Sequence, residues 1–265
     1  MNLTLYKKEW QSNWILWVIF AAVLTVYACM IVAMFDPKMG DSLKMMADSM
    51  PEIFAAFGMA DVGQTLLEFI SGYLYGILLT AFPAVYIILL SNKLVARYID
   101  NGSMAYLLAV PEKRTKMIRT QVIYSITSLL ALQIYIVVVL LIYSQIMFSG
   151  ELEITAFLRI NVGLFGLWMM MGGICFFFSS VFNDTKWASG CSTAFVVYAI
   201  LVQMISQVGD KFENIKYATP MTLFQVDGLA AGDGSAWVGC LVMYLIGIVF
   251  YVTAVQVFAR KDLPL

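Results

Sequence analysis

Histidine is absent from this 265-residue chain, and charged residues are scarce. Without imidazole side chains, the chain cannot build a histidine-based catalytic triad or a histidine-ligated metal site. Charged residues make up 12% of the sequence and hydrophobic residues 62%, whereas a soluble domain carries about twice that share of charge. With a mean hydropathy of +0.84, the composition indicates a protein that crosses a membrane several times.

Sequence motifs for enzymatic chemistry are also missing. No GxxxxGK(S/T) segment is present to bind a nucleotide phosphate. Hydrolytic motifs such as HExxH and GxSxG are absent too, as are paired carboxylates within an apolar run. We therefore predict a non-catalytic chain that carries no cofactor or metal of its own. The loop at 227–233 lacks the residue spacing of a calcium loop and is predicted to be a plain turn.

The four cysteines lie far apart, each within an apolar run, and form no CxxC pair. This pattern favours small buried apolar side chains, and a disulfide or metal site is the less favoured alternative. The residues are Cys29, Cys175, Cys191 and Cys240.

Six apolar runs are long enough to cross a bilayer as helices, which takes about 20 residues each. The predicted fold class is therefore an all-α integral membrane protein, with a single transmembrane domain over residues 1–265. Pro83 is expected to kink the second span. The first run is too long for the core of a signal peptide and is expected to be retained. The predicted spans cover residues 14–35, 67–98, 112–148, 157–178, 187–208 and 237–258.

Residues 1–13 are more polar, and two alternatives fit them. Leu3, Tyr6, Trp10 and Trp14 recur at helical spacing, which predicts an apolar face on an N-terminal helix that lies in the headgroup layer. Alternatively, the segment is a polar extension of the first spanning helix. The sequence favours neither alternative over the other.

The basic residues are divided unevenly between the two sides of the membrane. Six spans place both termini on one side, which then carries 11 of the 16 Lys and Arg residues, against 5 on the other. The positive-inside rule predicts that the side with the termini is cytoplasmic. We expect a multi-pass protein of the cell (plasma) membrane with both termini in the cytoplasm.

The stretch 92–119, between the second and third spans, carries 6 of the 16 basic residues. At its centre, residues 103–110 read SMAYLLAV, an uncharged apolar octet bounded by Asn101-Gly102 and Pro111. Eight residues cannot cross a bilayer. We therefore predict a short helix on the basic side of the membrane, with an apolar surface that must be covered.

Two faces of this octet are expected to contact different surfaces. Met104, Leu107 and Leu108 share one face, which could pack on the membrane helices of the chain itself. Tyr106 falls on another face and would be left for a partner. The alternative is a helix that simply lies at the membrane interface.

Five residues are candidates for a substrate path. Glu68 and Arg159 are ionisable groups near the ends of spans, where they either line a path or reach toward the headgroups. Phe82, Tyr86 and Gln203 are further candidates within the predicted spans.

The layout resembles the membrane permeases of ABC exporters of the second type, which export drugs, peptides and polysaccharides. The resemblance covers nearly the whole chain. It rests on the N-terminal segment, the six spans, the inside termini, the loop RYIDNGSMAYLLAVPEKRTKMIRTQ and the ending FARKDLPL.

The resemblance implies a coupling helix in the loop between the second and third spans, which docks on a separate ATPase subunit. That helix falls on Ser103, Met104, Ala105, Tyr106, Leu107 and Leu108. The resemblance also implies that ATP and Mg bind to the partner ATPase, and that two permease copies surround a cavity faced by the second and fifth spans. Short re-entrant helices before the sixth span would fall at 217–228.

The predicted function is that of a permease subunit in an ATP-driven exporter. Its apolar spans, rich in Met and aromatic residues, favour an amphipathic or hydrophobic cargo such as a peptide antibiotic, drug or lipid. Expected partners are ABC ATPase subunits, a second permease copy as a homodimer, and membrane lipid, but no nucleic acid. The alternative function is an ATP-independent channel or a membrane receptor or scaffold.

Overall fold

The computed structural model describes residues 2–36, 45, 49–56, 65–102, 114–208, 214–215 and 217–261. All regular structure in this part of the chain is helical, and six helical segments are long and apolar enough to cross a membrane. The predicted fold class, all-α with six spans, is confirmed. The segments are α1 (Leu3–Met34), Leu66–Asp100, α8 (Arg114–Met147), α9 (Ile154–Val181), α10 (Thr185–Ser206) and α12 (Gly234–Arg260).

The second span is a composite of four pieces. It begins with α4 (Leu66–Ile70), continues as a π-helix, η1 (Ser71–Leu78), and then as α5 (Leu79–Leu94). A break at Val95, with φ −129° and ψ −69°, separates α5 from α6 (Ala96–Asp100). The helical path is therefore interrupted just before the chain leaves the bundle.

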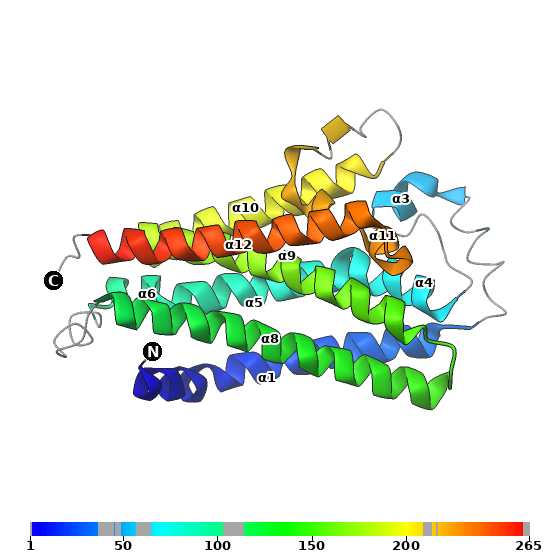
Figure 1. The fold of residues 1–265 in the computed structure, drawn as a ribbon, viewed down its shortest axis with the longest axis horizontal. Coiled ribbons are helices and arrows are strands. Elements are labelled where there is room, and N and C mark those ends of the chain that lie inside the picture. The colour runs from blue at the N-terminus through cyan, green and yellow to red at the C-terminus, as the bar shows by residue number, and fades with distance from the viewer. Residues whose placement is uncertain are drawn as a thin grey trace.

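Three short helices lie at the end of the bundle away from both termini (Figure 1). They are α3 (Pro51–Ala56), η3 (Pro220–Leu223) and α11 (Val226–Ala231). Short helices just before the sixth span, at 217–228, were expected from the family resemblance. Re-entry of η3 and α11 into a membrane stays a prediction.

Helix α9 forms the centre of the bundle. Its most apolar stretch is 78% buried, against 28% for α1 and 22% for α10. It packs against α5, α8, α10 and α12, and α12 lies along it for most of its length (Figure 1). The outer helices α1 and α10 leave most of their apolar surface exposed, as expected of helices that face lipid or another chain.

Helices α9 and α12 meet at two glycines. A Cβ atom on Gly173 would lie 2.5 Å from the carbonyl oxygen of Gly247, and a Cβ atom on Gly247 would lie 2.7 Å from the carbonyl oxygen of Met169. Both distances are too short for a side chain. Small residues at such a contact let two membrane helices approach backbone to backbone.

A proline in the second span is matched by a tryptophan from the fourth. Pro83 lies inside α5 and has no N–H, so the carbonyl of Leu79, four residues earlier, lacks its helical donor. The indole Nε1 of Trp168 donates to that carbonyl at 2.9 Å, and Trp168 is fully buried. A side chain from α9 thus replaces the amide that Pro83 removes.

Buried polar side chains join further helices within the core. The amide nitrogen of Asn161 donates to the hydroxyl of Tyr75 at 2.6 Å, and the amide of Gln133 donates to the Asn161 side-chain oxygen at 2.8 Å. The hydroxyl of Tyr251 bonds with that of Ser125 at 3.1 Å. These bonds connect η1, α8, α9 and α12. Each donor meets its acceptor only when the two helices turn these side chains toward each other.

The glycine contact predicts a sharp difference between two substitutions in α12. Gly247→Ala should force α9 and α12 apart and lower the free energy of unfolding by about 1–3 kcal/mol. Gly234→Ala is the matched control, because a Cβ atom there meets nothing within 4 Å; it should change stability by less than about 0.5 kcal/mol. Thermal unfolding in detergent micelles measures both, and equal effects would contradict the close contact.

The pairing of Pro83 with Trp168 predicts a coupled pair of substitutions. Trp168→Phe keeps an aromatic ring but leaves the Leu79 carbonyl without a donor, which should cost about 1–3 kcal/mol of unfolding free energy. In a Pro83→Ala background, the restored amide can donate to Leu79, so the same change should cost about 1 kcal/mol less. Unfolding by denaturing detergent in all four variants gives the coupling; equal costs in both backgrounds would refute it.

Candidate functional site

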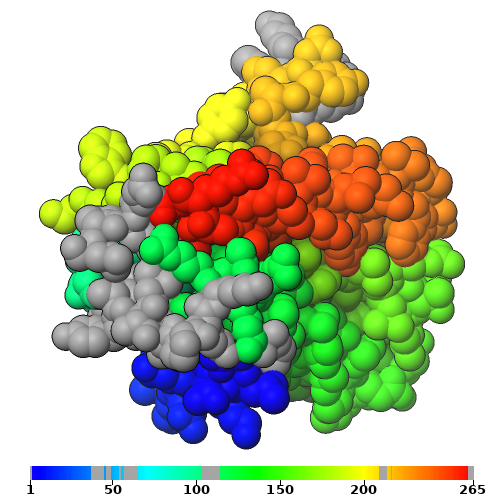
Figure 2. All heavy atoms as spheres, turned by 60° about the vertical axis from the view of Figure 1, so that its left-hand side comes forward, coloured from blue at the N-terminus to red at the C-terminus, as the bar shows by residue number. Residues whose placement is uncertain are grey.

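Both termini, α6 and the first turns of α8 lie at one end of the bundle, here called the terminal end (Figure 1). Figure 2 looks onto this end and shows the start of α1, the start of α8 and the last turns of α12 on one surface. The described basic residues gather here, and Arg159 is the exception. They are Lys7, Lys8, Lys93, Arg97, Arg114, Lys116, Arg119, Lys186, Arg260 and Lys261.

The predicted coupling residues lie outside the described part of the chain. These are Ser103, Met104, Ala105, Tyr106, Leu107 and Leu108. The backbone on either side of them is described. Gly102 has a φ of +67° and its N–H donates to the carbonyl of Ile99 at 3.0 Å, an arrangement that ends α6. The predicted break at Asn101-Gly102 is therefore confirmed.

The N-terminal segment continues into the first span as one helix, α1, which is what the extension alternative predicted. Tyr6 and Trp10 pack edge-on against the ring of Tyr124, at centroid distances of 5.9 and 5.4 Å. Leu3 and Trp14 are 64% and 55% exposed. Part of the predicted apolar face therefore packs against α8, and part of it is exposed. Its position in the headgroup layer stays a prediction.

The two ionisable path candidates both cap helices. The Glu68 carboxylate accepts from the backbone N–H of Thr65 at 3.2 Å, and the Thr65 hydroxyl accepts from the N–H of Glu68 at 3.3 Å. This capping box starts α4. Arg159 donates to the carbonyl of Ala230 at 3.4 Å, near the C-terminal end of α11. Each charged group therefore has a local structural role.

The three remaining path candidates do not share one cavity. Phe82 and Tyr86 lie on the side of α5 that faces α1, where their rings pack at 5.1 Å from Tyr27 and 5.3 Å from Phe20. The Tyr86 hydroxyl also bonds with a serine of α8. Gln203 lies in the last turns of α10, near the other end of the bundle. Roles for all five in transport stay predictions.

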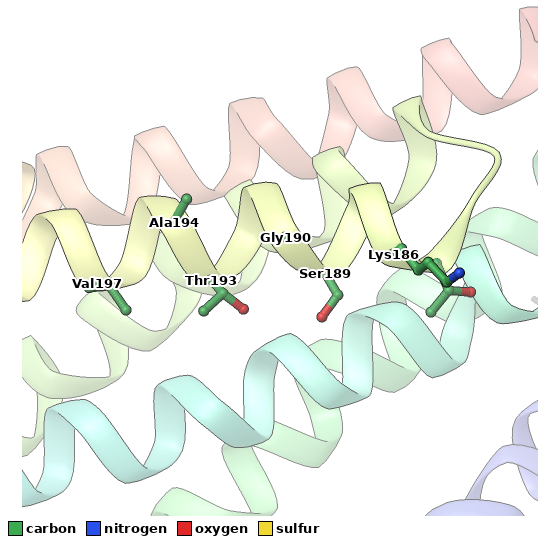
Figure 3. Close-up of a pocket in the computed structure, with 7 residues that line it drawn as sticks. Lys186, Ser189, Gly190, Thr193, Ala194 and Val197 are labelled. Atoms are coloured by element: carbon green, nitrogen blue, oxygen red, sulfur yellow. The ribbon is translucent and has the colours of Figure 1, made fainter.

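A hollow of about 770 Å³ runs along one face of α10 (Figure 3). Ser189, Thr193 and Val197 point toward α5 in this view, whereas Ala194 points the other way. Sequence reasoning missed these residues, although their small size within an apolar span was a signal. The lining residues are Thr185, Lys186, Ser189, Gly190, Thr193, Ala194 and Val197.

Lys261 joins α12 to α9 at the terminal end by hydrogen bonds. The Nζ atom of Lys261 donates to the carbonyls of Ser180 and Phe182 at 3.0 and 2.8 Å, at the C-terminal end of α9. Arg114 donates to the carbonyl of Lys261 at 3.4 Å. Burial lowers the pKa of Lys261 from its usual value to about 8, so the group is still mostly protonated at neutral pH. These contacts connect α8, α9 and α12.

The described residues do not meet the requirements of a metal site or of a disulfide. No group of three or more Cys, Asp or Glu residues there could hold a metal ion. All four cysteines are free thiols; Cys175 and Cys240 are buried, and Cys29 and Cys191 are half-buried. The prediction of buried cysteines is confirmed for Cys175 and Cys240 only.

The sequence profile of one protein family matches nearly the whole chain. The family is described as ABC-2 family transporter protein, and its match covers residues 3–263. No curated protein matches the chain. The six helices and the extent of this match agree with the resemblance drawn from the sequence. The chain therefore belongs to the ABC-2 transporter family and is a multi-pass membrane permease component of an ABC transporter.

Proposed function

We propose that this chain is the permease subunit of an ATP-driven exporter, and that it works as a pair of copies with two ATPase subunits on separate chains. The observation that carries the proposal is where the chain lies on either side of residues 103–113. The described residues on both sides of this range, Gly102 and Arg114, lie at the basic terminal end. By the positive-inside rule, this end faces the cytoplasm, where ATP is present.

The two helices that flank the loop are suited to carry a movement into the membrane. Helix α8 has 34 residues, so at about 1.5 Å per residue it is longer than the bilayer core is thick. The other flank, α6, follows the break at Val95, and the pieces before it, α4, η1 and α5, extend to the far end of the bundle. We propose that closure of the ATPases on ATP displaces residues 103–108 and, through these helices, switches access to a cavity.

The hollow on α10 supports a cavity and a partner copy on this side. Gly190, Thr193 and Ala194 are exposed within a span, where lipid contact favours larger apolar side chains. Small residues and hydroxyl groups suit close approach of another helix or contact with an amphipathic cargo. We propose that two copies related by two-fold symmetry face each other across α5 and α10, and that the cargo is amphipathic or hydrophobic.

An ATP-independent channel or receptor is the second candidate. A channel needs a polar lining that stays available to water or ions. The core amides of Gln133 and Asn161 instead bond to partners within the bundle. This internal pairing favours a transporter that changes conformation over a permanent pore.

Membrane orientation is tested by labelling single cysteines placed in a cysteine-free background. Cysteines at Ser49, Gly150 and Asp233 should react with an impermeant reagent in intact cells, because the opposite end faces outward in this proposal. Cysteines at Ser103 and Lys186 should react only after the cells are opened. External labelling at Ser103 would reverse the orientation and remove the proposed ATPase contact.

ATPase association is tested by co-purification with the cognate ATPase. The permease alone should hydrolyse no ATP, and the two chains should co-purify in equal amounts. Tyr106→Asp should place a charge in the contact and weaken association by about a hundredfold, without loss of permease from the membrane. Transport should be lost with it.

Leu107→Asp serves as the comparison, because Leu107 is expected to pack on the helices of the chain itself. It should lower permease stability and membrane level. Wild-type association and transport for Tyr106→Asp would exclude Tyr106 as the contact. ATP turnover by the isolated permease would contradict the division of labour between the two chains.

A further inference from the structure

The first turns of α1 bury a carboxylate at the terminal end. Glu9 is only 1% exposed. Its Oε1 atom accepts a hydrogen bond from the hydroxyl of Tyr98 at 2.9 Å and another from the amide of Gln121 at 3.0 Å. Its Oε2 atom accepts from the amide of Asn13 at 3.1 Å. Three neutral donors thus hold this buried group.

The three donors come from three parts of the fold. Asn13 lies one turn further along α1, Gln121 lies in α8, and Tyr98 lies in α6. Glu9 is therefore a junction between the N-terminal helix and both helices that flank the loop at 103–113. Burial makes this junction strong, because a carboxylate that loses donors in such a place has no water to replace them.

Helix α6 depends on such side-chain contacts for its position. It has only five residues, and the break at Val95 separates it from the backbone hydrogen bonds of α5. Among the described residues, α6 also packs through apolar side chains: Ala96 and Ile99 are buried, and α6 contacts α5 and α10. Apolar contacts permit sliding and rotation, whereas the bond from Tyr98 to Glu9 fixes both the distance and the rotation of α6 relative to α1.

We propose that Glu9 is a positioning residue of the transport cycle, which ties α6 to α1 and α8 so that a push on the loop moves the three helices together. The inference rests on the proposed function, because the push comes from a partner ATPase. It assigns to the N-terminal turns a part in coupling, in addition to their part in anchoring the chain. Glu9 touches no cargo in this account and acts only through Tyr98 and Gln121.

Tyr98→Phe is the most selective test, because it removes one hydroxyl and keeps the ring. Loss of the hydrogen bond to the Glu9 carboxylate should raise, at least about tenfold, the population of molecules in which α6 has moved away from α1. In the reconstituted complex, ATPase association and ATP turnover should stay near wild type, and transport per ATP hydrolysed should fall severalfold. Glu9→Gln should act in the same direction, because an amide keeps only one acceptor oxygen, and its NH2 group would face either the donor of Asn13 or the donors of Tyr98 and Gln121.

Tyr251→Phe is the matched control. It removes a tyrosine hydroxyl that is more buried than that of Tyr98 and that bonds to a serine of α8 at 3.1 Å, but it does not touch Glu9 or α6. It should leave transport per ATP unchanged even if thermal stability falls. A general loss of stability would affect both tyrosine variants alike, whereas loss of positioning affects Tyr98→Phe alone.

A second measurement separates this inference from the proposed function. Spin labels at Lys8 and Arg97, both exposed, report the distance between α1 and α6 in the permease alone, in lipid nanodiscs without ATPase. The distance distribution should be narrow in the wild type and broad in Tyr98→Phe. An unchanged distribution, or wild-type transport per ATP in Tyr98→Phe, would overturn the role of Glu9. A wild-type complex that does not transport would instead overturn the proposed function, whatever the labels show.

Discussion

Hydrocarbon offers no hydrogen-bond partners, so a polar group inside a membrane bundle must find its partner within the protein. This constraint decides much of the structure. The carbonyl that Pro83 leaves without a donor receives one from Trp168, and Asn161 bonds to both Tyr75 and Gln133. Apolar helix faces can rotate against lipid or each other at little cost, but a rotated amide loses its partner. These polar pairs thus limit how η1, α5, α8 and α9 can turn about their own axes.

The same constraint acts with charged groups at the terminal end. Lys261 binds the last carbonyls of α9, and Glu9 binds donors from α6 and α8. Bonds of this kind join helices at the terminal end by directed contacts in addition to apolar packing.

The sequence predicted those features of the fold that depend on residues close together in the chain. Apolar run length predicted the six spans, and Asn101-Gly102 predicted the end of α6, because both depend on residues adjacent in the chain. The sequence also indicated the family through its overall layout. The predicted coupling residues at 103–108 lie outside the described part, so the structure leaves them as predictions.

The sequence could not show which face of a helix turns inward. The spacing of Leu3, Tyr6 and Trp10 predicted an apolar face for the headgroup layer, but it did not indicate that the most buried stripe of this segment is Leu5, Glu9 and Asn13. Polar residues occupy that stripe because their partners come from α6 and α8, about 90 and 110 positions along the chain. Arg159 likewise looked like a path residue, because the carbonyl that it caps is visible only in the fold. Glu68 differs, because its capping box with Thr65 is a local pattern that the sequence already contains.

The contact between Gly173 and Gly247 also limits where the molecule can deform. Two backbones in direct contact have no side chains between them that could change rotamer to absorb a small shift. Helices α9 and α12 are therefore expected to keep their relative position where these glycines meet. The more exposed helices α1 and α10 have fewer neighbours within the subunit and more room to shift.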